Sequence, residues 1–276
     1  MPLVNFDEQF AAYTSEWMKT HSGRYATVEA MEDDLPRVYL SFLNTRARWL
    51  GGVTPGAYFT QFDDPKVLVD WLNAYCEEGV PVPDLLLERI TEVGRPCEKR
   101  LLELLKTEEA PDEARMIAVE LLREMESPLP KMLYIRWQLD RAPADELKDN
   151  ALESLVQMGP AVVQPILQEL PGANSAGEEA LLEVLSHFPG DERIFQLAMK
   201  LFAEKRDRRA LFAGYLARLG DERALPALIR AAQEPELPYL TFIEIRNAIE
   251  TLGGDSPERV WEDDPEYEAL RGLDET

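Results

Sequence analysis

The two histidines are the residues whose type could most readily transfer protons near neutral pH. His21 lies at the predicted end of a first helix, and His187 lies beside Phe188 just before a predicted turn. A general base needs partners within hydrogen-bond reach, and the sequence places none beside either histidine. A histidine at a helix C-terminus is also stabilised by the helix dipole. We therefore interpret both histidines as structural.

The two cysteines could do thiol chemistry or bind a metal if they were paired. Cys76 and Cys97 lie 21 residues apart and form no CxxC motif. Each falls on an apolar helical stripe, so we expect buried, reduced thiols rather than a redox or metal pair. The sequence also contains no Walker loop, GxSxG, HExxH, paired-cysteine zinc spacing or EF-hand loop. We expect no catalytic residue, no metal and no cofactor.

The charge of the chain excludes several classes of partner. The sequence has 29 Lys and Arg against 52 Asp and Glu, a net charge of −23. Such a surface repels phosphate backbones and anionic bilayers, so we expect no nucleic acid and no membrane partner. No signal peptide is visible, and no apolar stretch approaches the ~18 residues of a membrane span, which predicts a cytoplasmic protein. The acidity either attracts a partner with a basic segment or only keeps the protein soluble.

Two further charged motifs have both a structural and a functional interpretation. The tetrad Gly-Asp-Glu-Arg occurs at residues 190–193 and again at 220–223. We expect each Asp to cap the following helix and each Arg to reach the equivalent Asp of the next repeat. The basic cluster at residues 204–209 falls between two predicted helices. It is either a solvated loop or a site for an anionic peptide.

The elements that would position these residues repeat along the chain. Turn signals recur near residues 94, 127, 159, 190, 220 and 253, mostly at glycine. Apolar residues at i, i+3 and i+4 flank the turns, which predicts helix, tight turn, helix in each unit. One such hairpin cannot bury its apolar face alone, whereas a stack of hairpins forms a continuous core.

The best of these units carries a family resemblance. Residues 216–232, LARLGDERALPALIRAA, resemble the HEAT-repeat family, in particular its PBS-lyase HEAT-like subtype. Residues 187–202 match more loosely, and residues 155–170 keep the glycine and proline but lack the Asp and Arg. The resemblance covers about residues 85–255 and is clearest in 152–255. It implies an all-α fold in which the hairpins form an α-α superhelix, a HEAT-like solenoid.

The two ends of the chain lie outside this repeat pattern. Residues 1–84 are predicted to be helical and contain most of the aromatic residues, with 13 of the 24 in residues 1–75. They form either a cap over the end of the solenoid, the interpretation we prefer because the rings fall at core spacing, or an aromatic docking surface. Residues 256–276 are predicted to be an acidic capping helix or a flexible tail.

The resemblance bears on function through the residues that are missing. Deoxyhypusine hydroxylase, a HEAT-like enzyme, holds di-iron with His-Glu pairs, but here His21 is followed by Ser and His187 by Phe. HEAT-like DNA glycosylases present a basic face, which the charge disfavours. We expect a non-enzymatic scaffold that binds a protein or peptide. The alternative is an enzyme or enzyme subunit acting on a small molecule, bilin-lyase-like or other; a deep pocket with perturbed carboxylates would favour it.

A ligand-binding face follows from the resemblance as well. In solenoids of this kind the second helix of each hairpin usually lines the concave face. The surface position ten residues after each turn glycine is Glu169, Lys200 and Arg230 in successive repeats. These three are the predicted ligand contacts.

Overall fold

The structure is a computed structural model that describes residues 3–261 and 266–269, except Ser22, Arg24 and Ala26. The regular structure in these residues is helical, without a strand, which confirms the all-α prediction. The chain divides into two compact units, Met1–Pro130 and Lys131–Thr276. No described helix is long and apolar enough to cross a bilayer. The predicted domain boundaries at residues 84 and 255 stay predictions. The predicted capping helix or tail includes residues 262–265 and 270–276, which lie outside the described residues.

The first unit is built from short helices joined by an aromatic cluster. The ring of Phe6 lies 5.4 Å from that of Trp49 and 5.5 Å from that of Phe59. The ring of Trp71 meets that of Phe62 edge-on at 4.7 Å. Its α-helices are α1 (Phe6–His21), α2 (Val28–Glu32), α3 (Leu35–Asn44), α4 (Pro65–Glu77), α5 (Asp84–Val93), α6 (Arg95–Leu105) and α7 (Asp112–Glu124).

Side-chain caps fix where the helices of the first unit begin. The Asn5 Oδ1 atom accepts the Glu8 N–H at 3.1 Å, and Asp64 accepts the Lys66 N–H at 2.9 Å, ahead of Pro65. The Tyr75 hydroxyl donates to the Val4 carbonyl at 3.1 Å and lies 3.3 Å from the Val4 N–H, which donates to it. This pair ties the extended segment before α1 to α4.

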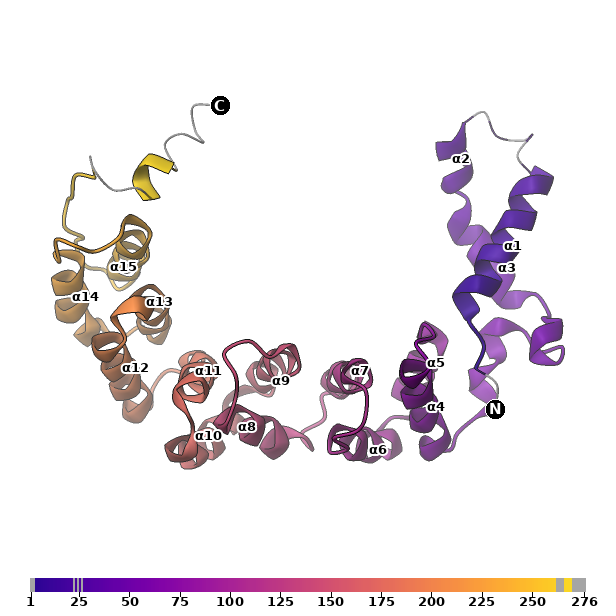
Figure 1. Cartoon of the computed structure of the whole chain (residues 1–276), viewed down its shortest axis with the longest axis horizontal. Helices are drawn as coiled ribbons and strands as arrows, with labels where there is room; N and C mark the ends of the chain where they lie inside the picture. The colour runs from indigo at the N-terminus through magenta and orange to yellow at the C-terminus, as the bar shows by residue number, and fades with distance from the viewer. Residues whose placement is uncertain (1–2, 22, 24, 26, 262–265, 270–276) are drawn as a thin grey trace. The chain divides into compact units, whose positions relative to one another are not determined.

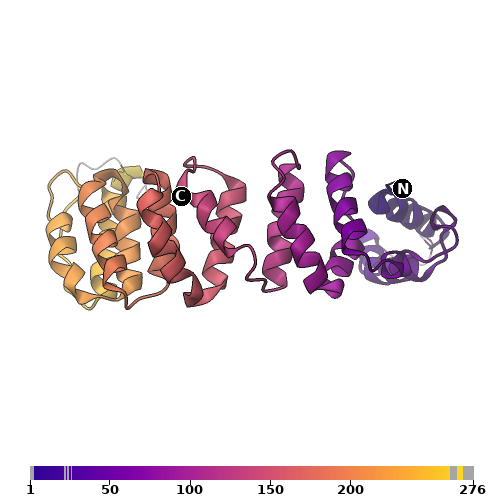
Figure 2. The same ribbon diagram turned by 90° about the horizontal axis from the view of Figure 1, so that it is seen from below.

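The second unit consists of helices that pack one after another in two layers. In Figure 1, α9, α11, α13 and α15 lie in one layer and α8, α10, α12 and α14 in the other. Figure 2 shows the same helices side by side with their axes roughly parallel. Its α-helices are α8 (Lys131–Leu139), α9 (Glu146–Gln157), α10 (Val163–Glu169), α11 (Ser175–Ser186), α12 (Glu192–Glu204), α13 (Arg209–Leu219), α14 (Leu225–Ala232) and α15 (Tyr239–Thr251). We call α9, α11 and α13 the first helices and α10, α12 and α14 the second helices, because each pair flanks a predicted turn.

The predicted turns occur where the backbone takes positive φ. Five of the six predicted turns have a glycine with φ between 69° and 110°. These glycines are Gly94, Gly159, Gly190, Gly220 and Gly253. At the turn predicted near residue 127 the position is filled by Glu126, the only described non-glycine residue with positive φ, at 52°. This left-handed conformation is unfavourable for a residue with a Cβ atom. The turns predicted from the sequence are therefore confirmed, and the turn at Glu126 has no glycine at its left-handed position.

The apolar stripes of the second unit form its core. Leu181, Leu185, Leu216 and Leu228 have no exposed surface, and the same is true of Ile245 on α15. These residues recur at helical spacing on both sides of each turn, so the inward faces predicted from the sequence are confirmed.

The two Gly-Asp-Glu-Arg turns have the predicted cap but a different arginine partner. Asp191 and Asp221 each accept the backbone N–H of the arginine two residues on, at 3.0 Å. The Arg193 guanidinium then donates to its own Asp191 and, at 2.9 Å, to Gln164 on α10 of the preceding hairpin. It does not reach the Asp of the next repeat, since the guanidinium extends backwards along the chain.

Candidate functional site

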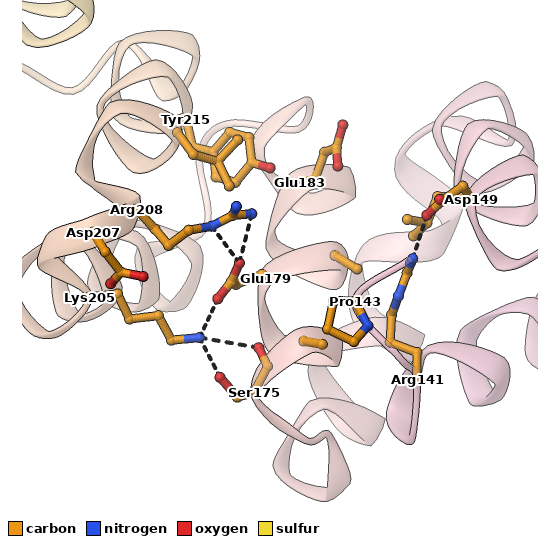
Figure 3. A pocket seen from close by; sticks show the side chains of 14 residues that line it. Arg141, Pro143, Asp149, Ser175, Glu179, Glu183, Lys205, Asp207, Arg208 and Tyr215 are labelled. Atoms are coloured by element: carbon orange, nitrogen blue, oxygen red, sulfur yellow. Dashed lines mark hydrogen bonds and ion pairs between the residues drawn. The ribbon is translucent and has the colours of Figure 1, made fainter. Parts of the chain in front are cut away.

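A hollow in the second unit is the best candidate for a functional site. It has a volume of about 690 Å³ and opens to solvent (Figure 3). The three first helices α9, α11 and α13 line it, together with the segments that precede α9 and α13. Its lining contains three cationic and four anionic side chains among apolar ones. These residues are Arg141, Pro143, Asp149, Leu152, Ser175, Ala176, Glu179, Ala180, Glu183, Lys205, Asp207, Arg208, Leu211 and Tyr215.

Two of the cations of the hollow share one carboxylate. The Lys205 ammonium donates to Glu179 Oε1 at 2.5 Å and to the Ser175 hydroxyl at 2.6 Å. The Arg208 guanidinium donates to Glu179 Oε2 at 3.1 Å. Figure 3 shows Glu179 between them, and its side chain is only 18% exposed. The basic cluster at residues 204–209 is thus partly held against α11, and its two lining cations are already paired.

The third cation is part of the wall. The Arg141 side chain is 4% exposed and ion-paired with Asp149. Its guanidinium also donates to Gln138 Oε1 at 2.8 Å and to the Ala142 carbonyl at 3.2 Å. A buried guanidinium with three acceptors is fixed in place and leaves little capacity for a ligand.

The remaining polar groups of the hollow have no such partners. No hydrogen bond or ion pair reaches the carboxylate of Glu183 or of Asp207 in the described part of the chain. Tyr215 is 4% exposed, and its hydroxyl likewise forms no hydrogen bond with a described residue. In Figure 3 that hydroxyl points towards the side of the hollow where Glu183 lies. Burial, and then the negative charge of Glu183, raise the pKa of Tyr215, so the phenol remains protonated.

Neither histidine lines the hollow. The His187 Nε2 atom accepts from the Arg218 guanidinium at 3.1 Å, and burial, followed by this cation, lowers the pKa of His187. The His21 ring stacks on Trp17 at 4.9 Å, and its Nδ1 lies 2.9 Å from the Trp17 carbonyl. The His187 imidazole thus has its partner on α13, and the His21 imidazole has its partner in its own helix.

The cysteines are buried as free thiols, as the sequence predicts. Cys97 has no exposed surface and Cys76 is 8% exposed. Burial raises the pKa of each thiol to about 11. Among the described residues no group of three or more histidine, cysteine, aspartate or glutamate side chains could hold a metal ion.

The predicted ligand contacts lie on the second helices, and none of them lines the hollow. Glu169 on α10 faces Arg136 at 3.7 Å, and Lys200 on α12 faces Glu178 at 3.5 Å. The exposed Arg230 on α14 donates to the carbonyl of residue 226 in its own helix. The structure brings no two of the three together in one hydrogen bond or ion pair, and their role stays a prediction.

Glu183 and Tyr215 were missed by the sequence reasoning, although a signal exists. They lie 32 residues apart, close to the spacing of the turns.

Comparison of the chain with protein-family models, curated proteins and solved structures gives no match. The geometry therefore carries the functional argument.

Proposed function

We propose that this chain is a non-enzymatic scaffold built on HEAT-like repeats, and that it binds a basic segment of a protein partner in the hollow of its second unit. The proposal includes an α-α superhelical stacking of the hairpins. It also includes a cytoplasmic location, which the two unpaired, buried cysteines support.

The regular spacing of polar contacts supports the repeat assignment. Side chains that join one hairpin to the next are separated by nearly constant intervals along the chain. Lys205 and Ser175 are 30 residues apart, and Arg223 and Glu192 are 31 residues apart. Each repeat of a solenoid meets its neighbour through equivalent positions, so constant intervals are what such a fold produces.

The charge distribution of the hollow is the observation that carries the binding proposal. Its lining cations are paired with Glu179 and Asp149, whereas the carboxylates of Glu183 and Asp207 have no partner among the described residues. A surface with unpaired carboxylates attracts cationic groups and repels anionic ones. Because three successive hairpins form this surface, an extended segment can contact each of them.

Selection from a displayed library of random dodecapeptides, with the full chain as bait, tests this function. We expect selected peptides to be rich in lysine and arginine and their affinity to fall between 0.1 M and 1 M salt, because the Debye length shrinks from ~10 Å to ~3 Å. Glu183→Gln combined with Asp207→Asn should weaken binding by about 2- to 10-fold.

Glu222→Gln provides the matched control for this experiment. It removes the same kind of charge from an exposed residue of the second unit that does not line the hollow. Its affinity should equal that of the wild type. Selection of acidic peptides, of no peptide, or of peptides whose affinity ignores both salt and the double substitution would contradict the proposal.

A further inference from the structure

We propose that Tyr215 and Glu183 form a recognition position within the hollow, which receives one long cationic side chain, a lysine or an arginine, of the bound segment. This inference rests on the binding function proposed above and names the chemical group that the hollow selects.

The hydroxyl of Tyr215 is the first observation. The side chain is 4% exposed, and its oxygen is not among the buried polar atoms that lack a partner, so the ring is buried while the hydroxyl meets the solvent of the hollow. A buried tyrosine typically has one apolar end and one polar end that takes a hydrogen-bond partner. Here the ring packs in the core, 5.9 Å from the ring of Phe212, while the hydroxyl lies at the lining of the hollow and bonds to no described residue. A ligand that supplies a donor at this point would replace solvent as its hydrogen-bond partner.

The carboxylate of Glu183 is the second observation. Arg218 on α13 lies beside Tyr215, with its guanidinium carbon 5.6 Å from the centre of the tyrosine ring. Its Nη1 donates at 2.8 Å to the Ser186 hydroxyl and at 3.1 Å to His187. Among the described residues, no ion pair joins Arg218 to Glu183. The carboxylate of Glu183 therefore remains available to a cation from outside.

The apolar part of the lining suits the stem of such a side chain. Leu152, Ala176, Ala180 and Leu211 line the hollow beside the polar groups. Lysine and arginine bury their methylene stems along apolar surface and keep the charged head at a polar site. In the hollow, the head would donate hydrogen bonds to the Glu183 carboxylate and to the oxygen of the protonated Tyr215 phenol.

An anionic side chain fits the hollow less well. The cations that line the hollow are Lys205, Arg208 and Arg141, and each of these already pairs with a carboxylate. An anionic side chain would also approach the unpaired Glu183 and Asp207, and like charges in one site repel. The observations therefore favour a cationic group.

Four Gly-Ser dodecapeptides that differ only in the central residue test the inference on the full chain. The central residue is lysine, arginine, norleucine or glutamate. An NMR titration follows the ¹³C-methyl signals of Leu211 and the ring signals of Tyr215, the latter assigned with Tyr215→Phe. We expect saturable shifts with the lysine and arginine peptides, binding of the norleucine peptide at least about fivefold weaker, and no shift with the glutamate peptide.

Three variants assign the effect to the two groups. Glu183→Gln should lower the affinity for the lysine peptide by about 2- to 5-fold. Tyr215→Phe, which removes only the hydroxyl, should lower it by about 2- to 10-fold. Neither should change norleucine binding or the urea midpoint of unfolding beyond the values of the control Glu222→Gln. A purely structural role of Tyr215 would instead alter binding of all peptides alike.

Equal binding of the lysine and norleucine peptides, preference for glutamate, unaltered affinity in Glu183→Gln, or absence of shifts at Leu211 would overturn the inference. The two proposals fail separately. If library peptides bind but ignore Glu183 and Tyr215, the recognition position is wrong and the scaffold function stands. If the lysine probe binds at Tyr215 while the library yields nothing, the scaffold function is wrong and the cation site stands.

Discussion

Arg223 connects two successive turns of the second unit through Glu192. Its Nη2 lies 2.7 Å from Oε2 of Glu192, and its guanidinium carbon lies 4.4 Å from the centre of the Phe195 ring. The same guanidinium holds Asp221, the N-cap of its own turn. One side chain therefore links a cap, an ion pair and an aromatic face.

Arg223→Gln should lower the urea midpoint of unfolding at pH 7. Hydrogen bonds from Arg223 lower the pKa of Glu192 below its ordinary value of 4.5. The ion pair therefore contributes to the free energy of unfolding in full above that ordinary pKa. It is lost as the pH falls through the lowered value of the folded state. The difference from wild type should therefore disappear in acid, and also in high salt. Arg230→Gln removes an exposed guanidinium that bonds only to a carbonyl of its own helix, so it should lower the midpoint less, and the difference from wild type should not disappear in acid.

Gly177→Ala should destabilise the second unit by about 1–3 kcal/mol. A Cβ atom at Gly177 would lie 2.2 Å from the carbonyl oxygen of Gln138, so α11 would have to move away from α8. Gly214→Ala is the matched control, because no atom lies within 4 Å of the added methyl. It should stabilise α13 by about 0.5–1 kcal/mol. Urea unfolding followed by circular dichroism measures both, and equal effects of the two substitutions would contradict the packing described here.

Glu126→Gly should stabilise the first unit. Relief of the left-handed conformation at Glu126 is worth about 1–2 kcal/mol, and the greater unfolded-state entropy of glycine offsets about 0.5–1 kcal/mol of it. We expect a net gain of about 0.5–1 kcal/mol in the free energy of unfolding. Gly220→Ala makes the opposite exchange, at φ 69°, and should destabilise the second unit. A loss of stability in Glu126→Gly would mean that the glutamate side chain makes a larger contribution than its strain.

Leu228→Asp should unfold the second unit. The side chain has no exposed surface, and a carboxylate there would be buried without a partner, at a cost of several kcal/mol. Val260→Asp introduces the same group at a residue that is 77% exposed and should be tolerated. Amide hydrogen exchange resolves the effect by segment. Native-like protection of α13 and α14 in the Leu228 variant would show that the inward face is misassigned.

Both thiols should react slowly with Ellman's reagent at pH 8 in the folded protein. Their raised pKa of about 11 leaves little thiolate, and burial blocks access. In urea both should react at the rate of ordinary cysteines. Fast labelling of the native protein at Cys76 or Cys97 would contradict the burial of that residue.

Local signals in the sequence were sufficient to predict the helices and turns. Positive φ at Gly159, Gly190 and Gly220 follows from the residue type, and the apolar positions beside these turns repeat at helical spacing. Glu126 shows the limit of this reasoning, since its turn had to be inferred from the spacing of its neighbours. Asp191 and Asp221 were likewise predictable as caps, because a carboxylate directly before a helix accepts its first N–H groups.

The hollow could not be found in the same way. Tyr215 falls at core spacing, and its ring is in the core, so the pattern does not reveal that the hydroxyl reaches the lining. Glu183 is one of 52 acidic residues, and only the packing of α11 against α13 distinguishes it. The interval of about 30 residues between paired side chains was the available signal. The Glu179–Arg208 pair is separated by 29 residues and the Ser186–Arg218 pair by 32.

The contact between Val4 and Tyr75 has a consequence for the order in which the first unit acquires its structure on the ribosome. The two residues lie 71 positions apart. At a synthesis rate of about 5–20 residues per second, Val4 emerges roughly 4–14 seconds before its partner. Throughout that interval the segment ahead of α1 has no α4 to dock on, and it is exposed to chaperones, proteases and modifying enzymes that act on nascent chains.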